Sequence, residues 1–275
     1  MVTKADVTAE MTFVGNATTL LRLGSFTLLT DPNFVSAGSR VHLGYGAWTR
    51  RLRDPAMTMD ELPPLDGVVL SHLHGDHFDR VARAELPNSM PIFTTPQARR
   101  RLRRWRFDDV HGLPTWETYD WTRGREQLRI TAVPGRHGPG PAARLLPDVM
   151  GSVLELLVDG VCRLRIYITG DTLCRPFLAQ VPERCGDIDA MIVHLGGTRL
   201  LGMLLTMDDR QGVEAVRLIR PQLTVPVHYD DYQVFKSPLS DFLNRATEHG
   251  LTGVRPIKRG DTLSLPIRPF VARTA

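Results

Sequence analysis

The pattern of apolar and polar positions predicts a chain that begins with strands and then alternates strands with helices. Short apolar runs rich in β-branched residues at 11–15, 18–23 and 26–30 are typical of strands, and Gly24-Ser25 between the last two is a two-residue hairpin signal. The same reasoning predicts strands at 67–71, 127–133, 151–158, 163–169, 188–194, 223–228, 254–257 and 262–267.

Helical spacing and capping residues predict helices at 79–86, 96–106, 208–220 and 238–249. Residues 33 to about 60 show no periodicity and are rich in Gly, Ser and Arg; a loop of this length is often functional. We see no internal repeat or linker, so we expect one domain over residues 1–275, built in layers with helices outside the sheets.

Composition narrows the class of protein. The 275 residues are 42% hydrophobic and 23% charged, which is ordinary for a globular chain. The net charge is +4, and the basic residues are nearly all arginine. No basic face is evident beyond one helix, so no nucleic-acid partner is expected. Three cysteines without a C-x-x-C pair, no apolar run of membrane-spanning length and no apolar signal segment predict a cytoplasmic protein.

The strongest chemical signal is the hexapeptide HLHGDH, directly after the predicted strand 67–71. Alternation in an extended segment points His72 and His74 in the same direction, and Asp76 and His77 follow at the turn, where they can face a second ion. Imidazole and carboxylate groups together suit zinc, with manganese or iron as alternatives. The hexapeptide therefore predicts a metal site with ligands for two divalent ions.

Three further ligand-type residues follow apolar strands: His137, Asp171 and His228. Open sheets place their sites at the carboxyl ends of strands, so these residues can converge with the hexapeptide. Each alone is more often structural, whereas their combination with HLHGDH favours ligands. His194 also ends a predicted strand, and we consider it a candidate catalytic residue that lines the cleft, with a buried structural histidine as the alternative.

The segments HLHGDH, PGRHG, TGDT and PVHYD, in this order, resemble the metallo-β-lactamase superfamily over nearly the whole chain. More narrowly, TDPNF followed by ELPPLDGVVLSHLHGDHFD is similar to the N-acyl-phosphatidylethanolamine-hydrolysing phospholipase D group, to which the ascorbate-6-phosphate lactonases are close relatives. The resemblance implies an α/β fold, a four-layer αββα sandwich with the site at one edge. It implies a first metal on His72, His74 and His137, a second on Asp76, His77 and His228, and Asp171 as the bridge.

Two neighbouring divalent ions can lower the pKa of a shared water from about 15.7 toward neutrality and make it a nucleophile. In this reading Asp76 orients the nucleophile or accepts its proton. A phosphodiesterase acting on a small or lipid-like substrate is our first hypothesis. A lactonase or other ester or amide hydrolase, a non-catalytic metal-binding protein and an iron redox enzyme stay open, as does a homo-oligomer.

Several surrounding residues are candidates for supporting or substrate-contacting roles. Sequence proximity makes Asp31, Asp79, Thr172, Asp230 and Asp231 candidates for orienting the imidazole ligands. The arginines of 99–106 form a solvated helix face or, alternatively, contact phosphate or an anionic membrane. Tyr45 and Trp48 in the long loop form an apolar lid or pack on the surface.

Overall fold

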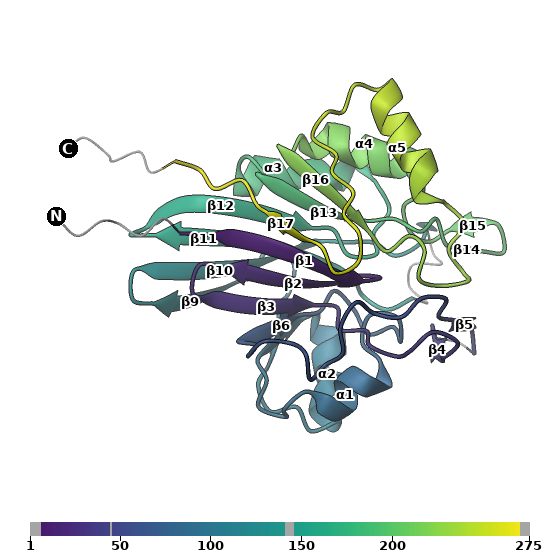
Figure 1. Cartoon of the computed structure of the whole chain (residues 1–275), viewed down its shortest axis with the longest axis horizontal. Helices are drawn as coiled ribbons and strands as arrows, with labels where there is room; N and C mark the ends of the chain where they lie inside the picture. Colours follow the sequence, from purple (N-terminus) through teal and green to yellow (C-terminus); the bar gives the residue numbers. More distant parts are fainter. Residues whose placement is uncertain (1–6, 45, 141–145, 270–275) are drawn as a thin grey trace.

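Two β-sheets packed face to face form the centre of the molecule (Figure 1). The computed structural model describes residues 7–44, 46–140 and 146–269, so Tyr45 lies outside the described residues. The first sheet has the order β17-β1-β2-β3-β6-β7-β8; its pairs from β17 to β3 are antiparallel and those from β3 to β8 are parallel. Its strands are β1 (Ala9–Gly15), β2 (Thr18–Leu23), β3 (Phe26–Thr30), β6 (Gly67–Val69), β7 (Ile92–Thr94), β8 (Val110–Gly112) and β17 (Thr262–Ser264).

The second sheet has the order β16-β13-β12-β11-β10-β9. Strands β12, β13 and β16 run parallel, and the remaining pairs are antiparallel. Asp159 and Gly160 make the tight turn between β11 and β12 with φ of 50° and 75°. Its strands are β9 (Thr118–Arg123), β10 (Glu126–Pro134), β11 (Met150–Val158), β12 (Val161–Ile168), β13 (Ala190–His194) and β16 (Leu223–Val227).

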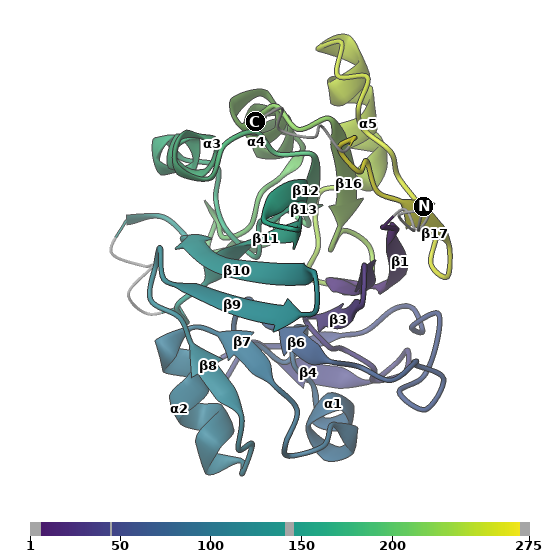
Figure 2. The same ribbon diagram turned by 90° about the vertical axis from the view of Figure 1, so that its left-hand side faces the viewer.

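Helices cover the outer face of each sheet, as Figure 2 shows. Helices α1 (Arg80–Glu85) and α2 (Pro96–Arg104) lie on the first sheet, and α3 (Gln180–Cys185), α4 (Asp209–Ile219) and α5 (Leu239–Glu248) lie on the second. The Asp79 and Asp208 side chains accept backbone N–H groups at the starts of α1 and α4 and so stabilise these ends. The expected four-layer αββα sandwich is confirmed.

Three apolar clusters separate these layers. The largest lies between the sheets, because alternate residues of each strand point inward; Leu21, Leu128 and Ile166 in it are fully buried. A second cluster joins the second sheet to α4 and α5, and a third joins the first sheet to α1 and α2. Burial of this apolar surface holds the strand ends of both sheets at one common edge.

Some expected elements differ. The long loop contains a small hairpin, β4 (Arg40–His42) and β5 (Trp48–Arg50), and a second one, β14 (Arg199–Leu200) and β15 (Met203–Leu204), lies near it. The strand expected at 254–257 is wrong, since Val254 makes only an isolated bridge to Thr224. Strands β7 and β8 were missed because three residues are too few for a recognisable alternation.

None of the helices in the described part of the chain has the length and apolarity needed to cross a membrane.

Candidate metal centre

The structure brings the seven predicted ligand residues together at the edge where the strands of both sheets end. The hexapeptide follows β6, His137 follows β10, Asp171 follows β12 and His228 follows β16. Candidate ligand atoms lie within 4.8 Å of one another in four overlapping groups. Three consist of predicted ligands: His72, His74 and His137; Asp76, His77 and His228; and His72, His77 and Asp171. The fourth joins Asp31, His77 and His194.

In the first group, three ring nitrogens face one point. His72 Nε2 lies 3.0 Å from His74 Nδ1. His137 turns its Nδ1 away, to the Leu205 carbonyl oxygen at 3.0 Å. The His72 Nδ1 lies 3.0 Å from the Ser71 hydroxyl, which itself donates to Asp31, so the hydroxyl accepts from His72. The free lone pairs of His72 and His137 are therefore on Nε2 and are directed inward.

In the second group, too, ring nitrogens face one point and the opposite nitrogens have other partners. His77 Nε2 lies 3.2 Å from His228 Nε2, which in turn lies 3.4 Å from Asp76 Oδ2. Their outer nitrogens are engaged: Nδ1 of His77 with Asp31 at 2.9 Å, and Nδ1 of His228 with the Leu195 carbonyl oxygen at 3.2 Å. Asp171 Oδ2 lies 3.3 Å from His77 Nε2, and the ligand atoms of Asp171, His77 and His72 lie within 4.8 Å of one another. This position between the two groups suits a bridging carboxylate.

These residues fit divalent metal ions. Imidazole nitrogens that converge at 3.0–3.2 Å are arranged as they would be around a shared cation. In the described part of the chain the buried Asp76 Oδ1 and Asp171 Oδ1 have no hydrogen-bond partner, which a metal ligand would explain. A mixed nitrogen and oxygen donor set suits zinc, iron or manganese.

Burial and the carboxylates set the charge of these rings. Burial lowers the pKa of His72, His137 and His74, that of His74 to about 3, so these rings are neutral at ordinary pH, which is the form that binds metal. Burial also lowers the pKa of His77, but the carboxylates around it, above all Asp171, outweigh burial and raise this pKa well above its ordinary value. The carboxylates thus attract positive charge to the second group.

Asp31 supports the centre from behind. Its carboxylate accepts the Ser71 N–H and hydroxyl at 2.7 and 2.8 Å and the His77 Nδ1–H at 2.9 Å. Burial raises the pKa of Asp31, but the imidazoles of His77 and His194 outweigh it and lower the pKa to about 2. The ionised Asp31 orients His77, as the sequence had suggested.

His194 differs from expectation. It is buried behind His77, and the two rings stack with their centroids 6.0 Å apart. His194 is not one of the described residues that line the cavity. Its Nε2 lies 3.4 Å from Asp31 and its Nδ1 lies 3.3 Å from the Thr169 hydroxyl. The side chain at the end of β13 points at Asp31, so His194 does not reach the cleft.

The other suggested supporting residues hold loops and do not contact ligand rings. Thr172 accepts the Arg136 N–H at 2.9 Å and so positions the loop that carries His137. Asp79 accepts backbone N–H groups of Phe34 and of Val35, in addition to capping α1. Asp230 pairs with Arg53 and Arg259 near the surface, and the buried Asp231 accepts the Asn16 N–H and pairs with Arg51.

Two residues near the centre were missed from the sequence. Asn16, with a left-handed φ of 52°, donates from Nδ2 to the Asp76 carbonyl oxygen at 2.6 Å and accepts the His228 N–H at 2.9 Å. Arg51 is fully buried and donates to the carbonyl oxygens of Asn33 and Val35. The Gly15-Asn16 dipeptide, which is typical of a turn, could have indicated Asn16. No local sequence signal indicates Arg51.

A cavity of about 170 Å³ opens over the centre. His74, Asp76, His137 and Asp171 form its polar floor. Its walls are mostly apolar and come from the β4–β5 turn, the β14–β15 hairpin and their neighbours. The apolar lining residues are Leu43, Ala47, Leu146, Leu200, Leu205 and Val234.

Comparisons with known proteins agree with this fold. A family model described as the beta-lactamase superfamily domain matches residues 27–229, and the chain belongs to this superfamily, the metallo-β-lactamases. It is 27% identical to a metal-dependent hydrolase of Anaeromyxobacter sp. (strain K), over 91% of this chain and 85% of the relative.

Two other similarities are informative. The chain is 25% identical to the N-acyl-phosphatidylethanolamine-hydrolyzing phospholipase D 1 of Caenorhabditis elegans, over 80% of this chain and 64% of that protein's length. The isothiocyanate hydrolase from Delia radicum gut bacteria superposes with a TM-score of 0.79 at 20% identity, covering 94% of this chain and 99% of that one. This structural likeness concerns the fold alone.

Proposed function

We propose that this protein is a hydrolase with a dinuclear metal centre, in which His72, His74 and His137 hold one ion, Asp76, His77 and His228 hold the other, and Asp171 bridges them. The observation that carries the proposal is the convergence of imidazole nitrogens whose outer partners leave only inward lone pairs. The relative from Anaeromyxobacter, named a metal-dependent hydrolase, supports the reaction class.

Two divalent ions bound here would supply a water nucleophile at neutral pH and Lewis-acid polarisation of the scissile group. The residues of the chain have separate tasks around that chemistry. Asp76 lies on the cavity floor with one oxygen that has no partner in the described part of the chain, so it can orient the nucleophile and accept its proton. His194, which we first considered catalytic, acts through Asp31 as a positioning residue for His77.

The cavity favours an uncharged substrate group with a compact apolar substituent. A dry cavity of roughly 150 Å³ accommodates a benzene-sized group, and this one measures about 170 Å³. Among the described lining residues the cationic side chain is Arg199, whose Nη2 lies 3.2 Å from Asp208 and so already has an anionic partner within the chain. A carboxylic ester or lactone is therefore our first candidate.

A phosphodiester is the second candidate. It is favoured by the similarity to the phospholipase D of Caenorhabditis elegans, which extends over 80% of the chain.

Metal analysis joined to a substrate screen tests the proposal. Protein purified without added metal should carry two equivalents of zinc, manganese or iron. It should hydrolyse p-nitrophenyl butyrate or a δ-lactone, lose this activity with a chelator and regain it with metal. Turnover of bis-p-nitrophenyl phosphate alone would select the phosphodiester. A single equivalent of metal would exclude the dinuclear centre, and iron without hydrolysis of any substrate would favour the redox alternative.

A further inference from the structure

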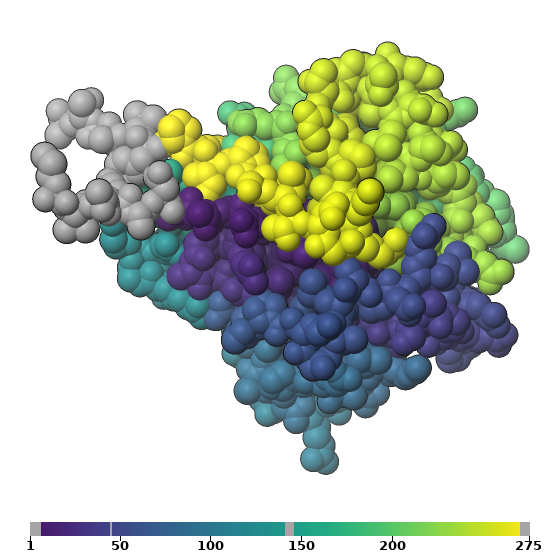
Figure 3. Space-filling model, in the orientation of Figure 1, coloured from purple at the N-terminus to yellow at the C-terminus, as the bar shows by residue number. Residues whose placement is uncertain are grey.

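The large exposed apolar side chains in the described part of the chain gather on two hairpins. Trp48, Leu200, Leu201 and Met203 are 62%, 49%, 91% and 38% exposed, and Leu52, two residues after β5, is 52% exposed. Both hairpins, β4–β5 and β14–β15, lie at the same end of the molecule (Figures 1 and 3). Both also contribute to the cavity walls, through Ala47 and Leu200. Grouped exposed apolar side chains of this kind mark an interaction surface.

The β4–β5 hairpin has one buried face and one face that combines an aromatic ring with cations. Val41 pairs with Thr49, and both are buried. The flanking pairs, Arg40 with Arg50 and His42 with Trp48, are exposed on the opposite face. Two like charges placed directly across a strand pair are unfavourable by themselves. The structure records no carboxylate within ion-pair distance of either arginine in the described residues, so this face suits an external anion.

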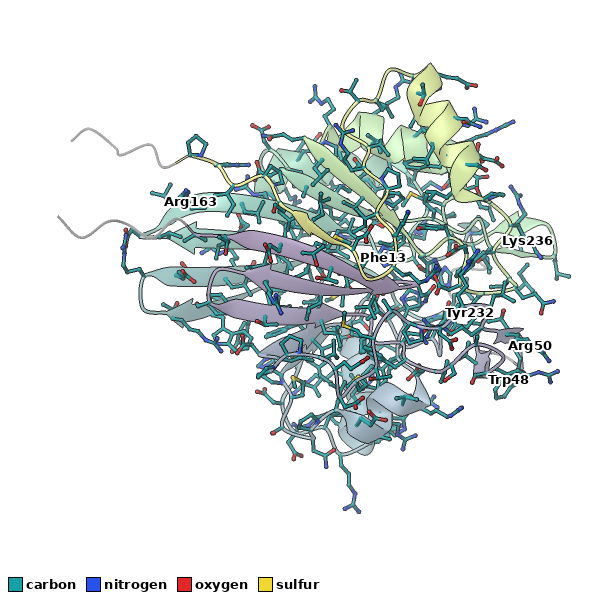
Figure 4. All side chains as sticks on the ribbon, in the orientation of Figure 1. Phe13, Trp48, Arg50, Arg163, Tyr232 and Lys236 are labelled. Atoms are coloured by element: carbon teal, nitrogen blue, oxygen red, sulfur yellow. The ribbon has the colours of Figure 1, made fainter. Side chains whose placement is uncertain are left out.

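A third cation lies at the same end. Figure 4 shows Lys236 near this end together with Trp48 and Arg50. The Lys236 ammonium donates to the Gln233 carbonyl oxygen and is exposed.

We propose that these two hairpins dock the protein on an anionic lipid surface, with Trp48 and Leu201 at the boundary of headgroups and acyl chains and Arg40 and Arg50 on the headgroup anions. Tryptophan is favoured at this boundary because its ring is apolar and its N–H is polar. Basic side chains beside an apolar tip add electrostatic attraction to acidic lipids.

A second copy of the chain suits this surface less well. A symmetric dimer would place the patch against itself, so Arg40 and Arg50 of the two copies would meet without a compensating carboxylate. The chain as a whole also carries a net charge of +4, which opposes self-association through a cationic face.

The arginines of helix α2 are the competing cationic surface, and they lack an apolar tip. Leu102 is fully buried, and Trp105 is half-buried with the Arg83 and Arg101 guanidinium groups over its ring at 4.2 and 5.2 Å. Arg100 and Arg104 are exposed without an exposed large apolar neighbour on this helix. They therefore serve as a matched control for charge alone.

Docking through the hairpins has a consequence for access to the cavity. Because the walls of the cavity include residues of both hairpins, its mouth would lie against the lipid surface. Apolar molecules dissolved in the membrane would then enter without crossing bulk water. The docking itself needs neither metal nor turnover, so it can be tested apart from hydrolysis.

Co-sedimentation of the full-length protein with vesicles tests the proposal. It should bind vesicles of phosphatidylcholine mixed with an equal amount of phosphatidylglycerol and bind pure phosphatidylcholine far less. Changing Arg40→Gln together with Arg50→Gln should lower the partition coefficient roughly 25-fold, since each basic residue near an acidic surface contributes about fivefold. The control pair Arg100→Gln and Arg104→Gln should change it less than about twofold if those residues do not reach the surface.

Fluorescence quenching by brominated phosphatidylcholine in the same vesicles identifies the inserted side chain. Quenching should be present in the unmodified protein and largely lost in Trp48→Phe, a variant that keeps an aromatic ring at the exposed position. The proposal is overturned if the protein binds neither kind of vesicle, if the control pair loses binding as much as the hairpin pair, or if Trp48→Phe keeps the full quenching. It is also overturned if light scattering finds a dimer that Trp48→Ser with Leu201→Ser dissociates.

Discussion

The core between the sheets and the candidate metal centre are both largely buried, yet the core consists of apolar side chains and the centre of polar ones. Leu128, Ile130 and Ile166 in the core are fully buried and apolar, and they lie in regular strands. His72 and His77 are also fully buried, but they lie in loops at the strand ends. Burial stabilises the first group and penalises the second unless a partner or a metal compensates.

The backbone shows the same contrast. Asn16, Asp31 and His228, all beside the centre, have left-handed φ values of 52°, 37° and 63°, which are unfavourable for residues other than glycine. Their side chains and amides are fixed by hydrogen bonds to neighbouring segments. The regular core therefore supplies the stability that holds a strained, polar site together at its edge.

Removal of the carboxylate that we propose as the bridge should have the largest effect. We expect Asp171→Ala to lower kcat/KM by about 10³-fold or more, because several kcal/mol of metal-dependent charge stabilisation are lost. Metal analysis should find less than two equivalents. The metal-free variant should also melt lower than the metal-free parent, because the buried His77 loses the carboxylate that pairs with it. Two retained ions with near-parental turnover would show that Asp171 is not a ligand.

A truncation in the core should have the opposite signature. Leu156→Ala, at a side chain that is 1% exposed, should lower the free energy of unfolding by about 2–5 kcal/mol. The folded fraction should keep its metal content. Leu157→Ala is the matched control, since this neighbour is only partly buried and should lose less. Denaturation in urea measures both. Equal losses in the two variants would contradict the inward assignment of Leu156.

Asp31→Asn probes the boundary between the two regions. It keeps the shape of the side chain but removes the charge that orients His77, so metal affinity should fall about 10- to 100-fold. The pKa of Asp31 is lowered from 3.8 to about 2 in the folded protein. Its ionised form therefore stabilises the metal-free fold above pH 4, and this contribution is lost as the pH falls toward 2. Asp31→Asn should flatten that part of the stability profile; an unchanged profile would mean that another group causes it.

The smallest effect is expected for His194→Leu. His194 acts through Asp31 across 3.4 Å, so we expect metal affinity to fall less than about 10-fold, at the lower limit for a supporting residue. The kcat of the fully metal-loaded variant should stay close to that of the parent. A loss of about 100-fold in kcat at full metal content, with a changed pH profile, would instead restore a direct catalytic role.

Local signals in the sequence were sufficient for much of this protein. Strands β2 and β3 were predicted with the residues at which they begin and end, because alternation and the Gly24-Ser25 turn are encoded within a few residues. The starts of α1 and α4 were marked by their capping aspartates. The seven ligand candidates were identified because histidine and aspartate followed directly after apolar strands.

Tertiary structure alone decided which side chains meet. The direction of His194, the burial of Arg51 and the contact of Asn16 with Asp76 depend on how two sheets and distant loops pack, over sequence separations that no local pattern records. The three-residue strands β7 and β8 exist because neighbouring strands pair with them. Short-range periodicity determined the longer elements of this chain, and long-range packing determined the shortest strands and the chemistry at the strand ends.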